Sequence, residues 1–431
     1  MQKPLKNGCR KVKLKEVCRE ITVGHVGSMA KEYVEEGIPF LRSQNILPFS
    51  LELSSVKYIT PEFHAKLKKS ALVPGDVAVV RTGYPGTACV IPSKLSICNC
   101  ADLVIIRPSE EVNAKYLTCI FNSTWGQGTI AGTLVGVAQQ HFNVSAAKEM
   151  EVNLPPRHTQ DKIAAILSAY DRLIENNTRR IEILEEMARS IYREWFVKFR
   201  FPGHEQVQMV DSELGRIPEG WRYSSLKTLP IQFIDGDRSS NYPKTSEFVD
   251  NGIIFLNTKN INKDKIDLSE VNFITREKFE GIKKGRVQPL DIVMTTRGSI
   301  GKIALFNCEY STALINAQML IIRADGQVID QIYLFYLMCS NEYQDVIKNF
   351  ASGSAQPQIP IQDLKQIEIL CPAIAIQGKF SEIVSSYNSL IKNLQSKNTN
   401  LRKTRDLLLP RLISGEIDVE NLDINISQIA A

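Results

Sequence analysis

The sequence predicts an α+β protein in which two similar mixed α/β domains are joined by two long helices that form an antiparallel coiled coil. Three observations lead to this fold class. Short motifs occur twice along the chain, turn residues interrupt the β-rich parts, and two segments carry an unbroken heptad pattern. The chain of 431 residues is also too long for a single hydrophobic core.

The repeat is clearest in two strand-and-turn segments that lie about half a chain apart. The segment VPGDVAVVRTGYPGTA begins at residue 73, and VQPLDIVMTTRGSIGKIA begins at residue 287. When the segments are aligned, Gly83 and Gly86 correspond to Gly298 and Gly301, which is an offset of 215 in sequence number. The offset reaches only 217 between AQQHFNV, from residue 138, and AQPQIPI, from residue 355. A tandem duplication explains this constancy and predicts two domains of similar fold.

Each copy begins with short β-branched runs broken by Gly, Pro and Asn, and ends in a long segment with helical periodicity. We therefore expect a first domain at residues 1–155, a long helix within 156–205, a second domain at 206–372 and a distal long helix within 373–415. Residues 416–431 are expected to form a C-terminal tail.

The two helical segments run from Ile163 to Trp195 and from Phe380 to Leu412, with seam positions spaced alternately by four and three residues. Each segment has 33 residues, which corresponds to roughly 50 Å of helix. Pro410 is expected to end or kink the second helix. Two amphipathic helices packed on their own domains are the alternative, but the narrow seam kept in both copies favours a coiled coil.

An antiparallel register follows if the pairing axis lies near residue 179. This register brings Asn177 opposite Asn398 and places the charge of Arg405 over the ring of Tyr170. The asparagine pair costs stability but is expected to fix the register, because a shift leaves the amides without partners. The other layers are Ile174–Leu401, Ile181–Leu394, Leu184–Ile391, Ala188–Tyr387, Ile191–Val384 and Trp195–Phe380.

The glycine turns do not match a nucleotide-binding loop. GSIGKI, from residue 298, has two residues between its glycines and Ile after Lys302, whereas a Walker loop has four residues there and Ser or Thr after its lysine. A further stretch, GQGTIAG at 126–132, is expected in a polar loop and is a weak signal for a cofactor. The histidines are isolated and the nine cysteines form no CxxC pair. We therefore predict no catalytic residues and no metal site, which indicates a binding protein.

Tight turns explain these glycines better, because glycine accepts positive φ. Arg81, Tyr84, Arg297 and Lys302 flank the turns and are candidates for contacts with DNA phosphates or bases. A turn with a solvated arginine explains the same pattern. The net charge of +5 permits nucleic-acid binding without requiring it. The longest apolar stretch, IYLFYLM, is much shorter than a membrane span, and no secretory signal is visible, so we expect a cytoplasmic protein.

Three segments resemble parts of the specificity (S) subunits of type I restriction–modification enzymes. The stretch that begins LPPRHTQDKIAAIL at residue 154 resembles their central helix, and PEGW at 218–221 resembles the opening of their second recognition domain. LLLPRLISGEI at 407–417 resembles the end of their C-terminal helix. The resemblance covers almost the whole chain, although the two domains match only in outline.

The resemblance implies a non-catalytic DNA-binding subunit of a prokaryotic methyltransferase and endonuclease complex. Each target-recognition domain would read one half of a bipartite, asymmetric site in double-stranded DNA. The helices would set the gap and recruit two methyltransferase (M) subunits, and restriction (R) subunits would complete the complex. S-adenosylmethionine, ATP and Mg would bind to the partner subunits and no cofactor to this chain. A coiled-coil adaptor that binds only proteins remains an alternative, and a self-sufficient nuclease or methyltransferase is disfavoured by the missing motifs.

Overall fold

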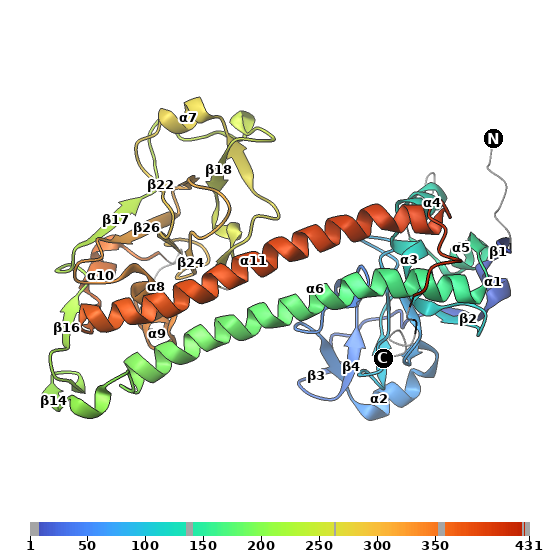
Figure 1. Ribbon diagram of the computed structural model, residues 1–431, viewed down its shortest axis with the longest axis horizontal. Helices are drawn as coiled ribbons and strands as arrows, with labels where there is room; N and C mark the ends of the chain where they lie inside the picture. Colours follow the sequence, from blue (N-terminus) through green and yellow to red (C-terminus); the bar gives the residue numbers. More distant parts are fainter. Residues whose placement is uncertain (1–7, 135–140, 263, 352–357, 425, 427–431) are drawn as a thin grey trace. The chain divides into compact units, whose positions relative to one another are not determined.

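A computed structural model of the chain describes residues 8–134, 141–262, 264–351, 358–424 and 426. Residues 138–140 and 355–357, which begin the last pair of repeated segments, lie outside this description. The chain forms two compact units, and Figure 1 labels several of their elements. Unit 1 contains Met1–Arg179 and Leu394–Ala431, and unit 2 contains Arg180–Asn393. Each unit therefore holds one copy of the repeat together with parts of both long helices.

Unit 1 is built on two sheets. The first sheet is antiparallel, and its strands in spatial order are β10 (Ala88–Val90), β9 (Val77–Val80), β12 (Leu103–Pro108) and β2 (Cys18–Val23). The second sheet has the order β3 (Tyr33–Val34), β7 (Lys57–Ile59), β4 (Ile38–Leu41), β11 (Cys98–Cys100) and β8 (Ala71–Leu72). Of the pairs in this second sheet, β11 with β4 is parallel and the others are antiparallel.

Shorter elements complete the domain in unit 1. They are β1 (Arg10–Lys13), α1 (Leu14–Val17), η1 (Ser43–Asn45), the hairpin of β5 (Ile46–Leu47) and β6 (Ser50–Leu51), α2 (Pro61–Lys66), η2 (Lys68–Ser70), α3 (Ala114–Asn122), α4 (Thr124–Leu134), α5 (Val144–Glu149) and β13 (Glu151–Leu154). Strand β1 pairs with β13, so the two ends of the domain are joined immediately before the long helix begins.

Unit 2 repeats this arrangement. Its first sheet has the order β17 (Ile231–Asp235), β26 (Met319–Ala324), β23 (Ile292–Thr295) and β24 (Ile303–Leu305). Its second sheet has the order β21 (Asn272–Ile274), β18 (Ile253–Leu256), β25 (Ala313–Ile315) and β22 (Arg286–Val287). The prediction of two similar mixed α/β halves is thus confirmed.

Most of the other elements of unit 2 have counterparts in unit 1. The shared elements are β16 (Arg222–Ser225), paired with β27 (Glu368–Cys371), the hairpin of β19 (Ile261–Asn262) and β20 (Lys265–Ile266), α7 (Arg276–Glu280), α8 (Gln331–Cys339), α9 (Asn341–Ala351) and α10 (Ile361–Gln366). The hairpin of β14 (Met209–Ser212) and β15 (Gly215–Pro218) precedes them and, like η4 (His204–Gln206) and η5 (Thr245–Glu247), has no counterpart among the described elements of unit 1.

The central strands are apolar over most of their length because both faces of the first sheet are covered. In β9, Val77 and Val79 belong to a core shared with Phe121 of α3, whereas Ala78 and Val80 pack in the core formed with the second sheet. Alternate side chains of a strand point to opposite faces, so a strand between two layers is buried on both faces. The same three-layer packing in unit 2 explains the buried run in β23.

The two long helices are α6 (Arg157–Tyr192), which continues as a π-helical turn through Val197, and α11 (Ile374–Ile413). Their segments are antiparallel within each unit. In unit 1, Asn177 contacts Asn398, and in unit 2 the ring of Trp195 lies 6.2 Å from that of Phe380, as expected. Pro410 lies inside α11, so it does not end this helix, and a kink at this position stays a prediction.

A buried glutamine attaches each domain to the first turns of its long helix. Gln160 and Gln377 correspond to each other in the repeat and are 1% and 0% exposed. The Gln160 side chain accepts a hydrogen bond from the Asn113 backbone N–H at 2.9 Å, and Gln377 accepts one from that of Asp330 at 2.8 Å. Asn113 and Asp330 are the N-caps of α3 and α8. Each glutamine therefore joins the start of the long helix to the start of a domain helix.

The stretch GQGTIAG lies in helix α4 and not in the loop that we expected. A Cβ atom on Gly126 would lie 2.0 Å from the carbonyl oxygen of Ile120, at the end of α3. Glycine at this position therefore permits close packing of α4 on α3, which outweighs its low helix propensity.

Candidate nucleic-acid interface

Two equivalent hairpins carry the repeated glycines. We call β9–β10 with Gly83 and Gly86 the first glycine hairpin, and β23–β24 with Gly298 and Gly301 the second. The four glycines have φ values of 83°, 90°, 74° and 76°, respectively. A Cβ on Gly86 would lie 2.5 Å from Ile130, and one on Gly301 would lie 2.8 Å from Ile347. The two turns therefore need glycine for the same reasons of conformation and space.

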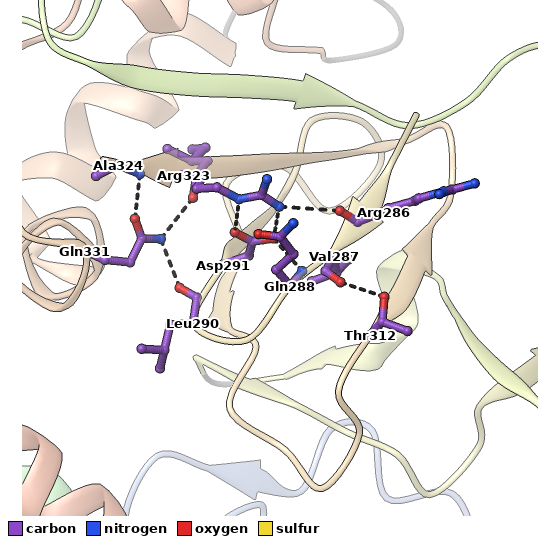
Figure 2. Close-up of polar contacts among 10 residues, drawn as sticks. Arg286, Val287, Gln288, Leu290, Asp291, Thr312, Arg323, Ala324 and Gln331 are labelled. Carbon is purple, nitrogen blue, oxygen red and sulfur yellow. Dashed lines mark hydrogen bonds and ion pairs between the residues drawn. The ribbon is translucent and has the colours of Figure 1, made fainter. Parts of the chain in front are cut away.

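An ion pair between a buried aspartate and a partly buried arginine anchors the second glycine hairpin, and Figure 2 shows its contacts. Asp291 is 2% exposed, and its carboxylate accepts hydrogen bonds from Nε and Nη2 of Arg323, both at 2.7 Å. The carboxylate also accepts a bond from the Gln288 backbone N–H at 2.7 Å. Arg323 Nη2 donates to the Arg286 carbonyl of β22 at 3.5 Å, so the pair joins the first sheet to the second. We call this arrangement the Asp–Arg clamp.

The clamp of unit 1 has the same residue types but looser contacts. Arg107 Nε lies 3.5 Å from Asp76 Oδ2, and Arg107 also forms an ion pair with Glu20. Arg107 Nη2 donates to the Ala71 carbonyl of β8 at 2.8 Å, which again joins the two sheets. Burial raises the pKa of Asp76, although the bond from the Val73 N–H and the charge of Arg107 act in the opposite direction.

The four predicted contact residues lie in different environments. Arg81 forms an ion pair with Asp102, and its side chain is only 16% exposed. Tyr84 is 83% exposed at the turn of the first glycine hairpin. Arg297 and Lys302 are exposed on the second, where Lys302 Nζ donates to the Ile261 carbonyl at 3.4 Å. Contact of these residues with DNA stays a prediction, and Arg81 is the least accessible of them.

Arg81 and Arg297 do not occupy equivalent positions. The carbonyl of Arg81 accepts a hydrogen bond from the Phe142 N–H at 3.1 Å, and the carbonyl of Thr296 accepts one from the Ile359 N–H at 3.1 Å. Thr296 is therefore the counterpart of Arg81, and Arg297 is one residue further along. The two hairpins have the same backbone conformation at their glycines but carry different side chains.

The predicted asparagine pair is in contact within unit 1. Asn177 Nδ2 donates to Asn398 Oδ1 at 2.9 Å. Asn398 is 3% exposed, and its Nδ2 donates to the Ile174 carbonyl at 3.4 Å and to Thr178 Oγ1 at 3.3 Å. The oxygen and the nitrogen of the Asn398 side-chain amide therefore both have hydrogen-bond partners. That the pair determines the register stays a prediction.

The expected stacking of Arg405 on Tyr170 was wrong. The guanidinium lies 4.7 Å from the ring centre of Phe49 and forms an ion pair with Asp171 at 2.6 Å. Phe49 reaches the helix from the β5–β6 hairpin, and this partner is not visible in the heptad pattern. Burial raises the pKa of Asp171, while the hydrogen bond and charge of Arg405 act to lower it.

The corresponding hairpin of unit 2 also contacts a helix arginine. Phe49 and Asp264 correspond to each other in the repeat, and both have positive φ, at 65° and 64°. Asp264 Oδ2 lies 3.5 Å from Nη2 of Arg189 in α6. Each domain therefore rests on a long helix through the tip of the same hairpin, by a cation–π contact in one unit and an ion pair in the other. These contacts had no signal in the sequence, because Phe49 and Asp264 share a repeat position but differ in residue type.

No His, Cys, Asp or Glu cluster within the described ranges has the arrangement of a metal site. The nine cysteines are free, and burial raises the pKa of Cys18 and of Cys89 to about 12. These two groups are therefore thiols, and not nucleophilic thiolates, at neutral pH. Among the described helices, none has the length and apolar character needed to cross a membrane.

The fold and the repeated hairpins define a duplicated binding protein with two similar domains and paired long helices. A family model described as "Type I restriction modification DNA specificity domain" matches residues 7–186 and again residues 218–403. The chain therefore belongs to this family and is a DNA specificity subunit of a type I restriction–modification system. A specificity subunit is non-catalytic, and the resemblance noted in the sequence is confirmed.

Specificity subunits from other systems are similar in sequence to much of this chain. The protein is 28% identical over 293 residues to the type I restriction enzyme MjaVIII specificity subunit of Methanocaldococcus jannaschii, covering 67% of each chain. It is 22% identical over 420 residues to the putative MjaX specificity subunit of that organism, covering 94% of this chain and 93% of the relative. A crystal structure of the type I S subunit from M. genitalium has a TM-score of 0.56 at 15% identity, over 96% of this chain and 98% of the other, which supports the fold.

Proposed function

We propose that each target-recognition domain reads one half of a bipartite, asymmetric DNA site. The observation that carries this proposal is a shared scaffold with different side chains at its exposed turn. Both glycine hairpins have the same φ pattern and rest on an Asp–Arg clamp. At equivalent turn positions, however, the first presents Tyr84 and Thr87, and the second presents Ser299 and Lys302. Equal backbones with unequal side chains suit two half-sites of different sequence.

We propose further that the recognition domains occupy residues 1–155 and 206–372, and that the helices within 156–205 and 373–415 set the gap between the half-sites. Two M subunits would dock on the helices and on neighbouring domain surfaces, and R subunits would complete the complex. The partners would bind S-adenosylmethionine, ATP and Mg. This assembly would act on DNA in the prokaryotic cytoplasm.

The experiment is to express the chain with its cognate M subunit in a host that lacks adenine methylation and to map the methylated adenines. We expect one motif with two specified blocks and an unspecified gap, and no motif with either subunit alone. Complex formation without a methylated motif would favour the protein-only adaptor. A specificity subunit that stays monomeric when mixed with its M subunit would contradict the docking.

A further inference from the structure

A basic groove lies beside the outer edge of the first sheet in unit 1. The groove has a volume of about 680 Å³ and follows β2, which is the last strand in the order of that sheet. Lys15 enters from α1, Lys69 from η2 and Lys148 from α5, and Arg19 comes from β2 itself. We call this the β2 groove, defined by these four basic residues.

The charge of the β2 groove is largely uncompensated. Glu20 is the acidic residue of its lining, and this carboxylate already forms an ion pair with Arg107. Lys15 Nζ lies 2.6 Å from Glu149. Over the described part of the chain, Lys69 and Lys148 form no ion pair. Their ammonium groups are exposed and available to an anionic ligand.

The lysines of the β2 groove recur in unit 2. Lys69 and Lys284 each lie two residues before the strand that ends the second sheet, β8 or β22. Lys148 and Lys365 correspond to each other in the repeat and lie in the equivalent helices α5 and α10. The third pair is Lys15 and Lys227.

Backbone contacts establish the equivalence of the third pair. Leu14 N–H donates to the Met150 carbonyl at 3.1 Å, and Leu226 N–H donates to the Ile367 carbonyl at 2.9 Å. The lysine after each leucine therefore occupies the same place.

Two lysines of unit 2, Lys365 and Lys227, also lie at the edge strand of their sheet. Lys365 Nζ lies 5.3 Å from the ring centre of Phe233 in β17, and β17 is the outer strand that corresponds to β2. The Lys227 N–H donates to the Lys365 carbonyl at 2.8 Å, so these two residues are neighbours.

The repeat separates two kinds of contact with DNA. Phosphates are the same at both half-sites, whereas the bases differ, so residues that bind phosphate can be shared by the two domains and residues that read bases cannot. The glycine hairpins differ in their exposed side chains, but the edge lysines are identical. We propose that the β2 groove and its counterpart at β17 bind backbone phosphates of DNA beside each half-site. This inference rests on the proposed function and assigns the orienting, sequence-independent part of recognition to these lysines.

The test uses the full chain with Lys69→Gln and Lys148→Gln together, and a second variant with Lys284→Gln and Lys365→Gln. The control is Lys57→Gln with Lys94→Gln, because these exposed lysines of unit 1 have no lysine counterpart in the repeat. Binding is measured over a series of KCl concentrations for two duplexes. One contains the motif that the methylation map identifies, and the other lacks this motif. Thermal unfolding establishes that the variants are folded.

The slope of log K against log salt is negative, and each lost phosphate contact should reduce its magnitude by about 0.9. Each double variant should therefore lose about 1.8 in slope on both duplexes, and the control should lose none. The preference for the motif should stay unchanged, because phosphate contacts carry no sequence information. An unchanged salt slope in the lysine variants would contradict phosphate binding by the β2 groove. Loss of M-subunit binding with normal DNA binding would contradict it as well. A wild-type chain without preference for the motif would instead refute the proposed function.

Discussion

At the scale of the residue, Asp291 and Arg323 connect the second glycine hairpin to both sheets. The sequence shows Asp76 and Asp291 at one repeat position, but it does not show their partners, because Arg107 and Arg323 lie on a strand that returns later in the chain. The pairing depends on the order of strands in the sheet. The two clamps also differ in strength, since Arg107 is shared with Glu20.

The difference between the clamps predicts different responses to one substitution. Asp291→Asn should lower the free energy of opening of the second glycine hairpin by about 1–3 kcal/mol, because the partly buried Arg323 loses its charged acceptor. Asp76→Asn should cost less than about 1 kcal/mol, because burial already favours the neutral form of this side chain. Hydrogen exchange measured by mass spectrometry reports on each hairpin separately. Equal losses in both hairpins would contradict this account.

The raised pKa of Asp171 predicts a dependence of stability on pH. Because folding raises this pKa above the value of 3.8 for the free group, the native state binds the proton more readily than the unfolded chain. Relative to Asp171→Asn, the wild type should therefore gain stability as the pH falls through the folded-state pKa, and the gain should be complete below 3.8. Urea unfolding of both proteins over this range measures the difference. A change of the opposite sign would mean that Arg405 outweighs the effect of burial.

Arg297 is the most accessible arginine of the two glycine hairpins. Arg297→Ala should weaken binding to the duplex with the methylated motif by about 1–3 kcal/mol if this side chain reads a base. Arg276→Ala is the matched control, because Arg276 is exposed on α7 in the same unit, with Glu280 as its partner at 3.1 Å. Unchanged affinity for the Arg297 variant would identify Arg297 as a solvated turn residue.

At the scale of the element, the heptad spacing was sufficient to predict both long helices, because one face of each helix repeats regularly. Their antiparallel contacts were predicted from the pairing axis that the duplication implies. Contacts made by other elements could not be read from that spacing. Arg405 contacts Phe49, which lies in a hairpin near the other end of the sequence. Gly126 lies in α4 because glycine permits close packing of this helix on α3. Local patterns predicted the elements, whereas tertiary packing selected the partners of individual side chains.

The asparagine pair predicts that a double substitution is less harmful than a single one. Asn398→Leu should lower stability by about 1–2 kcal/mol, because Asn177 loses a partner in an interface between helices. Adding Asn177→Leu should recover this loss and raise the thermal midpoint above that of the wild type, while the register becomes less well defined.

Thermal unfolding and spin-label distances test these two effects. Labels at Asn176 and Asn400 are suitable, because both positions are exposed on the paired helices of unit 1. The double variant should show a broader distance distribution than the wild type. Equal stability of the single and double variants, with an unchanged distribution, would show that other layers determine the register.

At the scale of the whole molecule, duplication explains why the same hairpin, clamp and buried glutamine occur twice. Gln160 and Gln377 join each domain to the start of a helix, so each domain is attached to the paired helices by the same contact. The repeat offset was enough to predict two equivalent domains. The sequence read by either domain depends on side chains that differ between the copies, and no periodicity reveals it.

The most direct test of the central claim is a map of adenine methylation before and after replacement of residues 206–372 by the corresponding domain of another type I specificity subunit. We expect one block of the bipartite motif to change, while the other block and the length of the gap stay the same. A change in both blocks, or a motif that is unaffected by the replacement, would contradict the assignment of one half-site to each domain.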